Sequence, residues 1–266
     1  MNNRLASVVV ISMLVLLLAL IDRLTPYRYD DEVNLDERLL PPSPKHLLGT
    51  DSLGRDVLTR LLHGFRLSLA LSLLSIALSA AVGSLIGISS ALSKPIQIVV
   101  DPLFSFLYVV PSVIVAAVIA FTVGFGLHVV AIAIALRLLP VFYRIVRTVA
   151  LTVAVQPYIE AARAMGASLL HIVLHYIGRE AMRTVAVLSI YSFPEALSME
   201  ISLSFIGLGV QPPTPSIGGM LAEGVRYVAV APHIILPPAV VVFATILVLD
   251  VVGEEIEKYR RERTLI

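Results

Sequence analysis

Long apolar stretches separated by short polar breaks make up most of the chain. A helix needs about 20 predominantly apolar residues to cross a bilayer. The stretch from Leu103 to Leu136 holds no acidic or basic residue except His128, and at about 1.5 Å per residue it is too long for one crossing. We therefore predict a turn at Gly124-Phe125-Gly126. The predicted membrane spans are Leu5–Ile21, Leu67–Leu92, 98–123, 127–146, Ala181–Phe205 and Ile234–Val252.

Composition supports a polytopic membrane protein. The 266 residues are 58% hydrophobic and 15% charged, whereas a soluble domain carries about 45–50% apolar and about 25% charged residues. The predicted fold class is all-α, with six membrane-spanning helices. A net charge of +1 provides no strong field for nucleic acid. The absence of cysteine excludes disulfides and thiolate chemistry.

The charge distribution predicts that both chain ends face the cytoplasm. Six spans put the two ends on one side, and with the amino end inside, twelve of the 20 Lys and Arg residues fall in inner segments. Asp22 follows the first apolar run, which disfavours a cleaved signal peptide. The predicted parts are residues 1–22 (first span), 23–66 (extracytoplasmic segment), 67–253 (core of five spans, with a cytoplasmic loop at about 148–180 and an external loop at about 206–232) and 254–266 (cytoplasmic tail).

The extracytoplasmic segment ends in an amphipathic pattern. Apolar residues recur at helical spacing between Leu53 and Phe65, and Thr50 or Asp51 is a suitable N-cap. We predict a helix that lies on the outer surface before the second span.

The same segment contains a near match to a phosphate-binding loop. Residues 49–56 read GTDSLGRD, but Arg55 and Asp56 replace the Lys and the hydroxyl residue of GxxxxGK[ST]. We therefore expect a non-catalytic chain without cofactors, so any ATP hydrolysis would belong to another chain.

The predicted cytoplasmic loop carries the signals of two short helices. Pro157 suits a first helical position, Gly166 a helix end and Ser168 the next N-cap. An apolar stripe on this segment would rest either on lipid headgroups or in the groove of a partner protein. His171 and His175 have a metal-binding spacing, but no carboxylate accompanies them, and we expect no metal site. The stripe consists of Tyr158, Ala162, Met165, Leu169, Ile172 and Tyr176.

Charged residues inside predicted spans suggest a translocation path. Such charges usually face a partner or a wet cavity. Arg137 and Glu195 would line the path, either paired or in contact with a zwitterionic substrate, or Arg137 would reach the cytoplasmic interface. Glu200 is a third candidate for lining the path. Alternatively, Glu200 is a structural acid near the outer interface. Arg144 and Arg147 are interpreted as anchors at the cytoplasmic end.

Three separated stretches give the chain a resemblance to a known family. They are HLLGTDSLGRDVLTRLLHGFRLSL at 46–69, EAARAMGAS at 160–168 and EISLSFIGLGVQPPTPSIGGMLAEG at 200–224. In these, the chain resembles the integral-membrane permease subunits of binding-protein-dependent ABC importers, in the branch that carries dipeptides, oligopeptides and nickel. Asp101 and Pro111 in the third span, and Arg144 and Arg147 after the fourth span, also fall where this family tends to place them. The resemblance marks as structural signature Gly49, Asp51, Gly54, Arg55, Asp56, Gly207 and Gly209.

The resemblance implies a type I ABC importer permease fold in a prokaryotic plasma membrane. It also implies that the chain forms half of a translocation pathway for peptides. The partners would be a second permease subunit, expected to be a different chain, one or two cytoplasmic ATPase subunits and an external solute-binding protein. In the family the EAA loop docks in a groove of the ATPase. The residues that this assigns to coupling are Glu160, Ala161, Ala162, Arg163, Gly166 and Ser168.

Two questions stay open at this point. The family loop usually ends in Leu-Pro where this chain has Gly178-Arg179, which leaves the helix kink at that point undecided. The solute would be a peptide, with nickel or oligosaccharides as alternatives. From another class, an ion-coupled secondary transporter would need coupling-ion sites and internal repeats.

Overall fold

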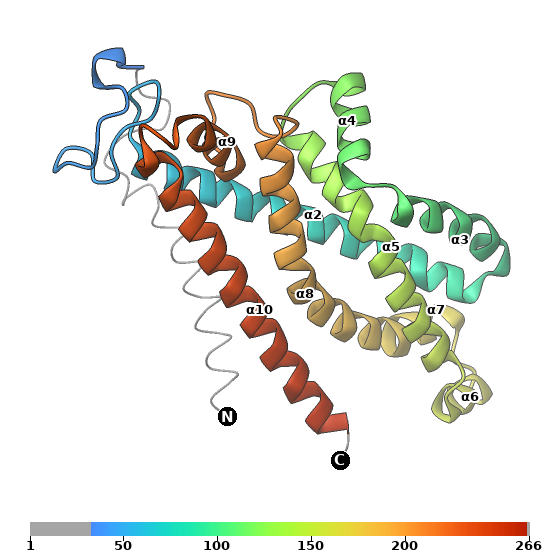
Figure 1. Cartoon of the computed structure of the whole chain (residues 1–266). Coiled ribbons are helices and arrows are strands. Elements are labelled where there is room, and N and C mark those ends of the chain that lie inside the picture. The colour runs from blue at the N-terminus through green and yellow to red at the C-terminus, as the bar shows by residue number, and fades with distance from the viewer. Residues whose placement is uncertain (1–32, 265–266) are drawn as a thin grey trace.

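The structure of the protein is a computed structural model that describes residues 33–264, without the side chains of residues 252 and 254–264. The predicted first span, Leu5–Ile21, lies outside the described residues. The described chain is helical, as predicted. Its β structure is limited to an isolated antiparallel bridge between Thr50 and Asp56. Figure 1 shows three long helices, α2, α5 and α8, which cross at the centre of the molecule.

Helix α2 spans Val57–Leu92 without a break. The prediction of a separate surface helix before the second span is therefore wrong, because residues 57–66 continue directly into that span. The predicted N-cap is also wrong. Asp56 caps the helix by accepting a hydrogen bond from the Thr59 backbone N–H at 2.8 Å, whereas Thr50 is held in the β-bridge.

The predicted third span is two helices rather than one. Helices α3 (Lys94–Val109) and α4 (Ser112–Val123) meet at an angle of 97°. Pro111 lacks an N–H and disfavours a helical conformation in the residue before it, and Val110 accordingly has φ −69° and ψ 125°. The predicted turn after this pair is confirmed, since Gly124 has φ 100° and Gly126 has φ 153°.

The remaining elements follow in chain order. They are η1 (Leu35–Glu37), α5 (Leu127–Ala154), α6 (Pro157–Ala164), α7 (Leu169–Ile172), the π-helix η2 (Val173–Ile177), α8 (Gly178–Phe205), α9 (Ile217–Tyr227), η3 (Pro232–Ile234) and α10 (Leu236–Thr264). Figure 1 places α9 at one end of the bundle, and α6, α7 and the carboxyl end of α10 toward the other.

Length and composition identify several membrane-crossing helices in the described residues. Three single helices qualify, at Val57–Leu92, Leu127–Ala154 and Pro232–Val251, and the bent α3–α4 pair would make a fourth. Helix α8 covers the predicted fifth span, but it includes charged residues such as Glu195 and Glu200 and does not qualify by composition.

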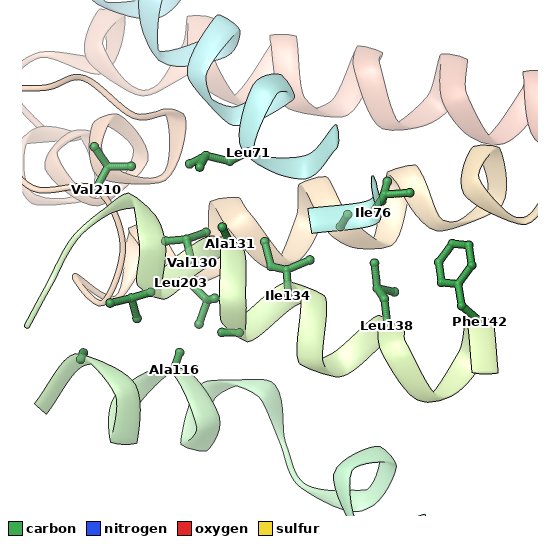
Figure 2. Packing of buried hydrophobic residues seen from close by; sticks show 14 residues of the cluster. Leu71, Ile76, Ala116, Val130, Ala131, Ile134, Leu138, Phe142, Leu203 and Val210 are labelled. Carbon is green, nitrogen blue, oxygen red and sulfur yellow. The ribbon is translucent and has the colours of Figure 1, made fainter. Parts of the chain in front are cut away.

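Close packing of α2 on α5 forms the centre of the core. A Cβ on Gly83 would lie 2.8 Å from the Phe142 Cβ, and one on Gly87 would lie 2.9 Å from the Tyr143 carbonyl oxygen. Gly83 and Gly87 form a GxxxG pair, and only glycine permits this close approach of the two helices. Ser79 adds a hydrogen bond from its hydroxyl to the Ala135 carbonyl at 2.9 Å. Figure 2 shows the buried side chains that α2, α4, α5 and α8 contribute to this core.

Candidate functional site

The segment formed by α6 and α7 has a well-defined local structure. Pro157 is the first residue of α6, as predicted. Gly166, at φ +85°, ends that helix. The Gly166 N–H donates to the Arg163 carbonyl at 2.9 Å and the Ala167 N–H to the Ala162 carbonyl at 3.0 Å, which is the hydrogen-bond pattern of a Schellman motif. The predicted cap is also confirmed, because the Ser168 hydroxyl accepts from the His171 N–H at 3.2 Å.

The predicted apolar stripe divides between two faces. Ala162 and Ile172 are buried with Ile159 against the end of α5. Met165 and Leu169 are 81% and 58% exposed and point away from the bundle. The expectation of one continuous stripe is therefore wrong. The inner half attaches the segment to the bundle, and the outer half remains exposed.

The exposed face combines apolar and charged groups. Glu160, Ala161 and Arg163 are exposed, and neither charged side chain is in an ion pair within residues 33–264. A shallow, open pocket borders this face, lined by Ala162, Met165, Gly166, Ala167, Ser168, His171 and Tyr176. No heavy atom lies within 4 Å of a Cβ built on Gly166. Glycine is therefore required at position 166 because of the positive φ, and not because a side chain there would clash with neighbouring atoms.

The open question at Gly178-Arg179 has a structural answer. The chain continues from the π-helix into α8 without a kink at Gly178, whose φ and ψ are −62° and −39°. A Cβ at this position would lie 3.0 Å from the Val173 carbonyl oxygen. Gly178 thus directly follows the π-helix, and its lack of a side chain leaves room for the Val173 carbonyl oxygen.

The intramembrane charges separate into two environments. Arg137 of α5 and Glu195 of α8 form an ion pair at 3.5 Å, with 26% and 46% of their side chains exposed. Glu200 is fully buried and accepts a hydrogen bond from the Ser204 hydroxyl at 2.9 Å. The first pair therefore lies on a surface of the chain, whereas Glu200 lies in its interior.

Sequence reasoning missed the partners that α3 provides for the arginines on α5. Asp101, Ser105 and Tyr108 recur on α3 at spacings of four and three residues, so they share one helix face. The arginines of α5 are spaced seven and three residues apart on a facing helix. The match between the spacing of these residues on α3 and the spacing of the arginines on α5 would have indicated that the two helix faces are in contact.

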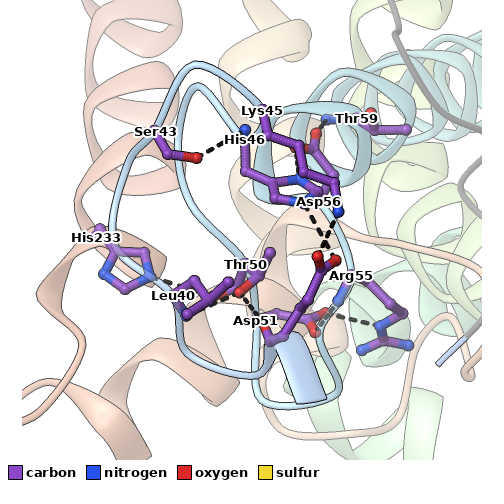
Figure 3. Close-up of polar contacts among 11 residues, drawn as sticks. Leu40, Ser43, Lys45, His46, Thr50, Asp51, Arg55, Asp56, Thr59 and His233 are labelled. Atoms are coloured by element: carbon purple, nitrogen blue, oxygen red, sulfur yellow. Dashed lines mark hydrogen bonds and ion pairs between the residues drawn. The ribbon is translucent and has the colours of Figure 1, made fainter. Parts of the chain in front are cut away.

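The loop before α2 is fixed by buried polar contacts, and Figure 3 shows most of them. Asp51 accepts from the Arg55 Nε at 2.7 Å and lies 3.2 Å from the Arg60 Nε. Asp56 Oδ2 is 2.9 Å from the His46 Nδ1. The Lys45 ammonium hydrogen-bonds to Glu37 and holds the pKa of that carboxyl below its usual value. We call residues 33–56 with their contacts to α9 and η3 the loop cluster.

The loop cluster also reaches far along the chain. The Ser52 N–H donates to Glu223 of α9 at 2.9 Å, and the Thr50 carbonyl oxygen is 3.2 Å from the His233 Nε2. A Cβ on Gly49 would lie 2.5 Å from the Leu40 carbonyl oxygen. The predicted signature residues at 49–56 thus form a structural joint.

The second signature stretch follows α8. Gly207 has φ +83° and open space around it, whereas a Cβ on Gly209 would lie 2.2 Å from the Ser204 Oγ.

His171 and His175 stack with ring centroids 4.2 Å apart. Across residues 33–264, no group of three or more His, Cys, Asp or Glu side chains gathers as metal ligands would.

Comparison with known proteins identifies the family. Residues 83–259 match the family described as the binding-protein-dependent transport system inner membrane component. The chain is 39% identical, over 236 residues, to the glutathione transport system permease protein GsiD of Salmonella typhimurium, an alignment that covers 87% of this chain and 77% of that one. GsiD of Escherichia coli O6:K15:H31 is 35% identical over the same coverage. The chain belongs to this transport family.

Solved structures agree on the fold of this permease. Inward-facing conformations of the MetNI methionine ABC transporter match with a TM-score of 0.60 at 16% identity, covering 75% of this chain and 95% of that one. An amino acid ABC transporter crystallised with histidines matches with a TM-score of 0.58 at 18% identity, covering 75% and 94%. The expected ABC importer permease fold and inner-membrane location are thereby confirmed.

The loop cluster of the permease gives a stability prediction. Asp51 forms ion pairs with two largely buried guanidinium groups, those of Arg55 and Arg60. Breaking a buried ion pair from one side destabilises a protein by about 3–5 kcal/mol. We expect Asp51→Asn to lower the thermal unfolding temperature in detergent. Glu223→Gln, which keeps an oxygen to accept from Ser52, should have a smaller effect. Equal unfolding temperatures for Asp51→Asn and the parent would contradict the structural joint.

Proposed function

We propose that the chain forms half of the translocation pathway of an ATP-driven peptide importer and couples to a separate ATPase subunit through its loop at about 148–180. It would cross the membrane six times with both ends in the cytoplasm. The twelve basic residues of the inner segments support this orientation. The joint location of α6, α7 and the end of α10 at one end of the bundle also supports it.

The exposed face of α6 and α7 is the observation that carries the proposal. Its buried side, with Ile159 and Ile172, fixes the segment to the bundle. Its outer side presents Met165 and Leu169 beside the exposed charged side chains of Glu160 and Arg163. Apolar anchors beside a charged rim are typical of a protein interface. A groove of an ATPase fits this chemistry better than lipid headgroups, because the helix breaks at Gly166 into two short arms.

The partners follow from the same assignment. The family name already implies a solute-binding protein. We further propose a second permease subunit, of a different sequence, to complete the pathway. One or two ATPase subunits would supply the energy and bind ATP and Mg²⁺, so this chain itself would carry out no catalysis.

The proposed solute is a peptide. Relatives named as glutathione transport permeases, at up to 39% identity, support a small peptide ahead of nickel or an oligosaccharide. The test is uptake by the complete complex in proteoliposomes, with S-methylglutathione as the probe. We expect uptake to require ATP and the ATPase subunit. Uptake driven by a proton or sodium gradient without the ATPase would overturn the proposal and favour a secondary transporter.

The ion pair between α5 and α8 gives a second test of the pathway. Arg137→Glu would break the present ion pair with Glu195, which is 3.5 Å long, and would place a second carboxylate on the facing helix. Loss of the attraction and repulsion between the two carboxylates together amount to about 1 kcal/mol or more, so uptake should fall several-fold. The exchange variant, Arg137→Glu with Glu195→Arg, restores the pair and should recover part of the activity. Full activity in Arg137→Glu alone would exclude the pair from the pathway.

A further inference from the structure

A row of polar contacts joins α3 to α5 along the candidate span Leu127–Ala154. Asp101 lies 3.8 Å from Arg147, the Ser105 hydroxyl accepts from Arg144 at 3.3 Å, and the Tyr108 ring centre lies 4.7 Å from the Arg137 guanidinium. We call these three pairs the arginine ladder. The two helices run antiparallel, so the order of residues on α3 mirrors the order on α5.

Charge is unevenly distributed along the arginine ladder. Asp101 neutralises Arg147 at one end, and Glu195 neutralises Arg137 at the other. Within residues 33–264, Arg144 is not in an ion pair, and its contacts are the Ser105 hydroxyl and the face of the Tyr108 ring at 4.9 Å. The central pair therefore carries an excess positive charge.

The arginine ladder is also accessible from the surface of the chain. Arg144 and Ser105 are exposed, and 43% of Tyr108 is exposed. A guanidinium facing hydrocarbon costs at least about 2.5–3.5 kcal/mol, so such groups face protein or water. The exposed, non-helical backbone at Pro111 follows Tyr108 closely. Backbone of this kind is tolerated at membrane depth only where protein covers it or where it lines a wet cavity.

The chemistry of the central pair selects an anion. A guanidinium matches the planar, bidentate geometry of a carboxylate. A carboxylate can replace the weak 3.3 Å contact between Arg144 and Ser105 with a charge-assisted one. A divalent cation would be repelled by the excess positive charge, and a neutral sugar would leave Arg144 uncompensated.

We propose that the arginine ladder binds an anionic group of the transported solute, with Arg144 and Tyr108 as its central contacts. The solute therefore carries at least one free carboxylate. This inference rests on the proposed function and narrows its substrate class. It disfavours nickel and neutral oligosaccharides.

The chain contains no cysteine, so one introduced thiol reports on this surface directly. Ser105→Cys is a small change beside Arg144. The complete complex, in nanodiscs without ATP, is treated with the anionic sulfonatoethyl and the cationic trimethylammonioethyl methanethiosulfonate. Each labelling rate is normalised to the rate of the same reagent with a small free thiol.

A positive, wet site should favour the anionic reagent about ten-fold or more. Arg144→Gln in the same background should remove this preference. Arg183→Gln is the matched control, because Arg183 pairs with Glu180 on α8 away from the ladder, and it should leave the preference unchanged.

In the comparison of the two reagents, three results would overturn the inference. The first is an unreactive thiol at position 105, which is expected if lipid or the second permease covers it. The second is equal labelling rates for the two reagents. The third is a preference for the anionic reagent that persists in Arg144→Gln. S-methylglutathione should protect the thiol, and its fully amidated form should not. Equal protection by both forms, or by neither, would count against a carboxylate site. An anionic lipid headgroup as the occupant would appear as slower labelling in nanodiscs containing phosphatidylglycerol than in pure phosphatidylcholine, and would also overturn the inference.

This experiment separates the two proposals. Labelling needs neither ATP nor transport, so the charge preference can be present in a complex that fails to import. In that case the proposed function fails alone. Conversely, ATP-dependent uptake by a complex in which position 105 shows no charge preference would contradict only the anionic substrate class.

Discussion

Gly166→Val is expected to reduce ATP-dependent uptake about ten-fold or more while leaving the helices in the membrane. Gly166 has φ +85°, a conformation that costs an ordinary L-residue about 1–2 kcal/mol and a β-branched residue more. Relief of this strain would break the hydrogen bonds from Gly166 and Ala167 that end α6. Met165 and Leu169 would then lose their relative placement. The measurements are uptake in proteoliposomes and co-purification of the ATPase.

Gly166→Asn is the matched control for this change. Asparagine adopts positive φ more readily than other residues, and the space around Gly166 is open. The asparagine variant should therefore retain most of the coupling, although its side chain is similar in volume to valine. Loss of activity in both variants would assign the effect to contact with the ATPase rather than to backbone conformation. Full activity of Gly166→Val would disprove the coupling role of this glycine.

Gly54→Ala is expected to have the largest effect on stability. Gly54 has φ +78°, and a Cβ there would lie 1.8 Å from the Asn34 carbonyl oxygen. The loop from residue 33 would have to separate from the start of α2. Backbone strain of about 1–2 kcal/mol and an overpacking penalty of about 1–3 kcal/mol would add. We expect a clear drop in the thermal unfolding temperature and in the yield of folded protein in detergent.

Gly207→Ala isolates the strain contribution. Gly207 has a similar φ of +83°, but a Cβ at this position would have no heavy atom within 4 Å. The variant should therefore lose stability only through backbone strain, and less than Gly54→Ala does. If the two variants unfolded at the same temperature, the close approach of Asn34 to Gly54 would not be a constraint on the fold.

Local signals in the sequence predicted the α6–α7 segment well. Proline at a helix start, glycine at a helix end and serine as a cap act within a few residues. Pro157, Gly166 and Ser168 each occupy the predicted position. The division of the apolar stripe was not predictable in this way, because the end of α5 decides which of its residues are buried.

Tertiary contacts explain what the sequence did not reveal. The start of α2 depends on the loop cluster, whose contact between Ser52 and Glu223 joins residues 171 positions apart. The bend at Pro111 leaves the hydropathy of residues 98–123 unchanged, so an apolar run cannot distinguish a straight span from a bent pair. The sequence offered an ion pair between Arg137 and Glu195 as one alternative, and only the packing of α5 on α8 shows that the pair forms.

The unbroken course of α2 has a mechanical consequence. Its 36 residues correspond to about 54 Å at 1.5 Å per residue, well beyond the roughly 30 Å of a bilayer's hydrocarbon core. At its beginning, Asp56 contacts His46 of the loop cluster. Near its end, Ile88 packs on the cluster that holds α6 and α7. In the proposed topology, helix α2 connects the two faces of the membrane as one rigid element, so a tilt at one end would displace the contacts at the other.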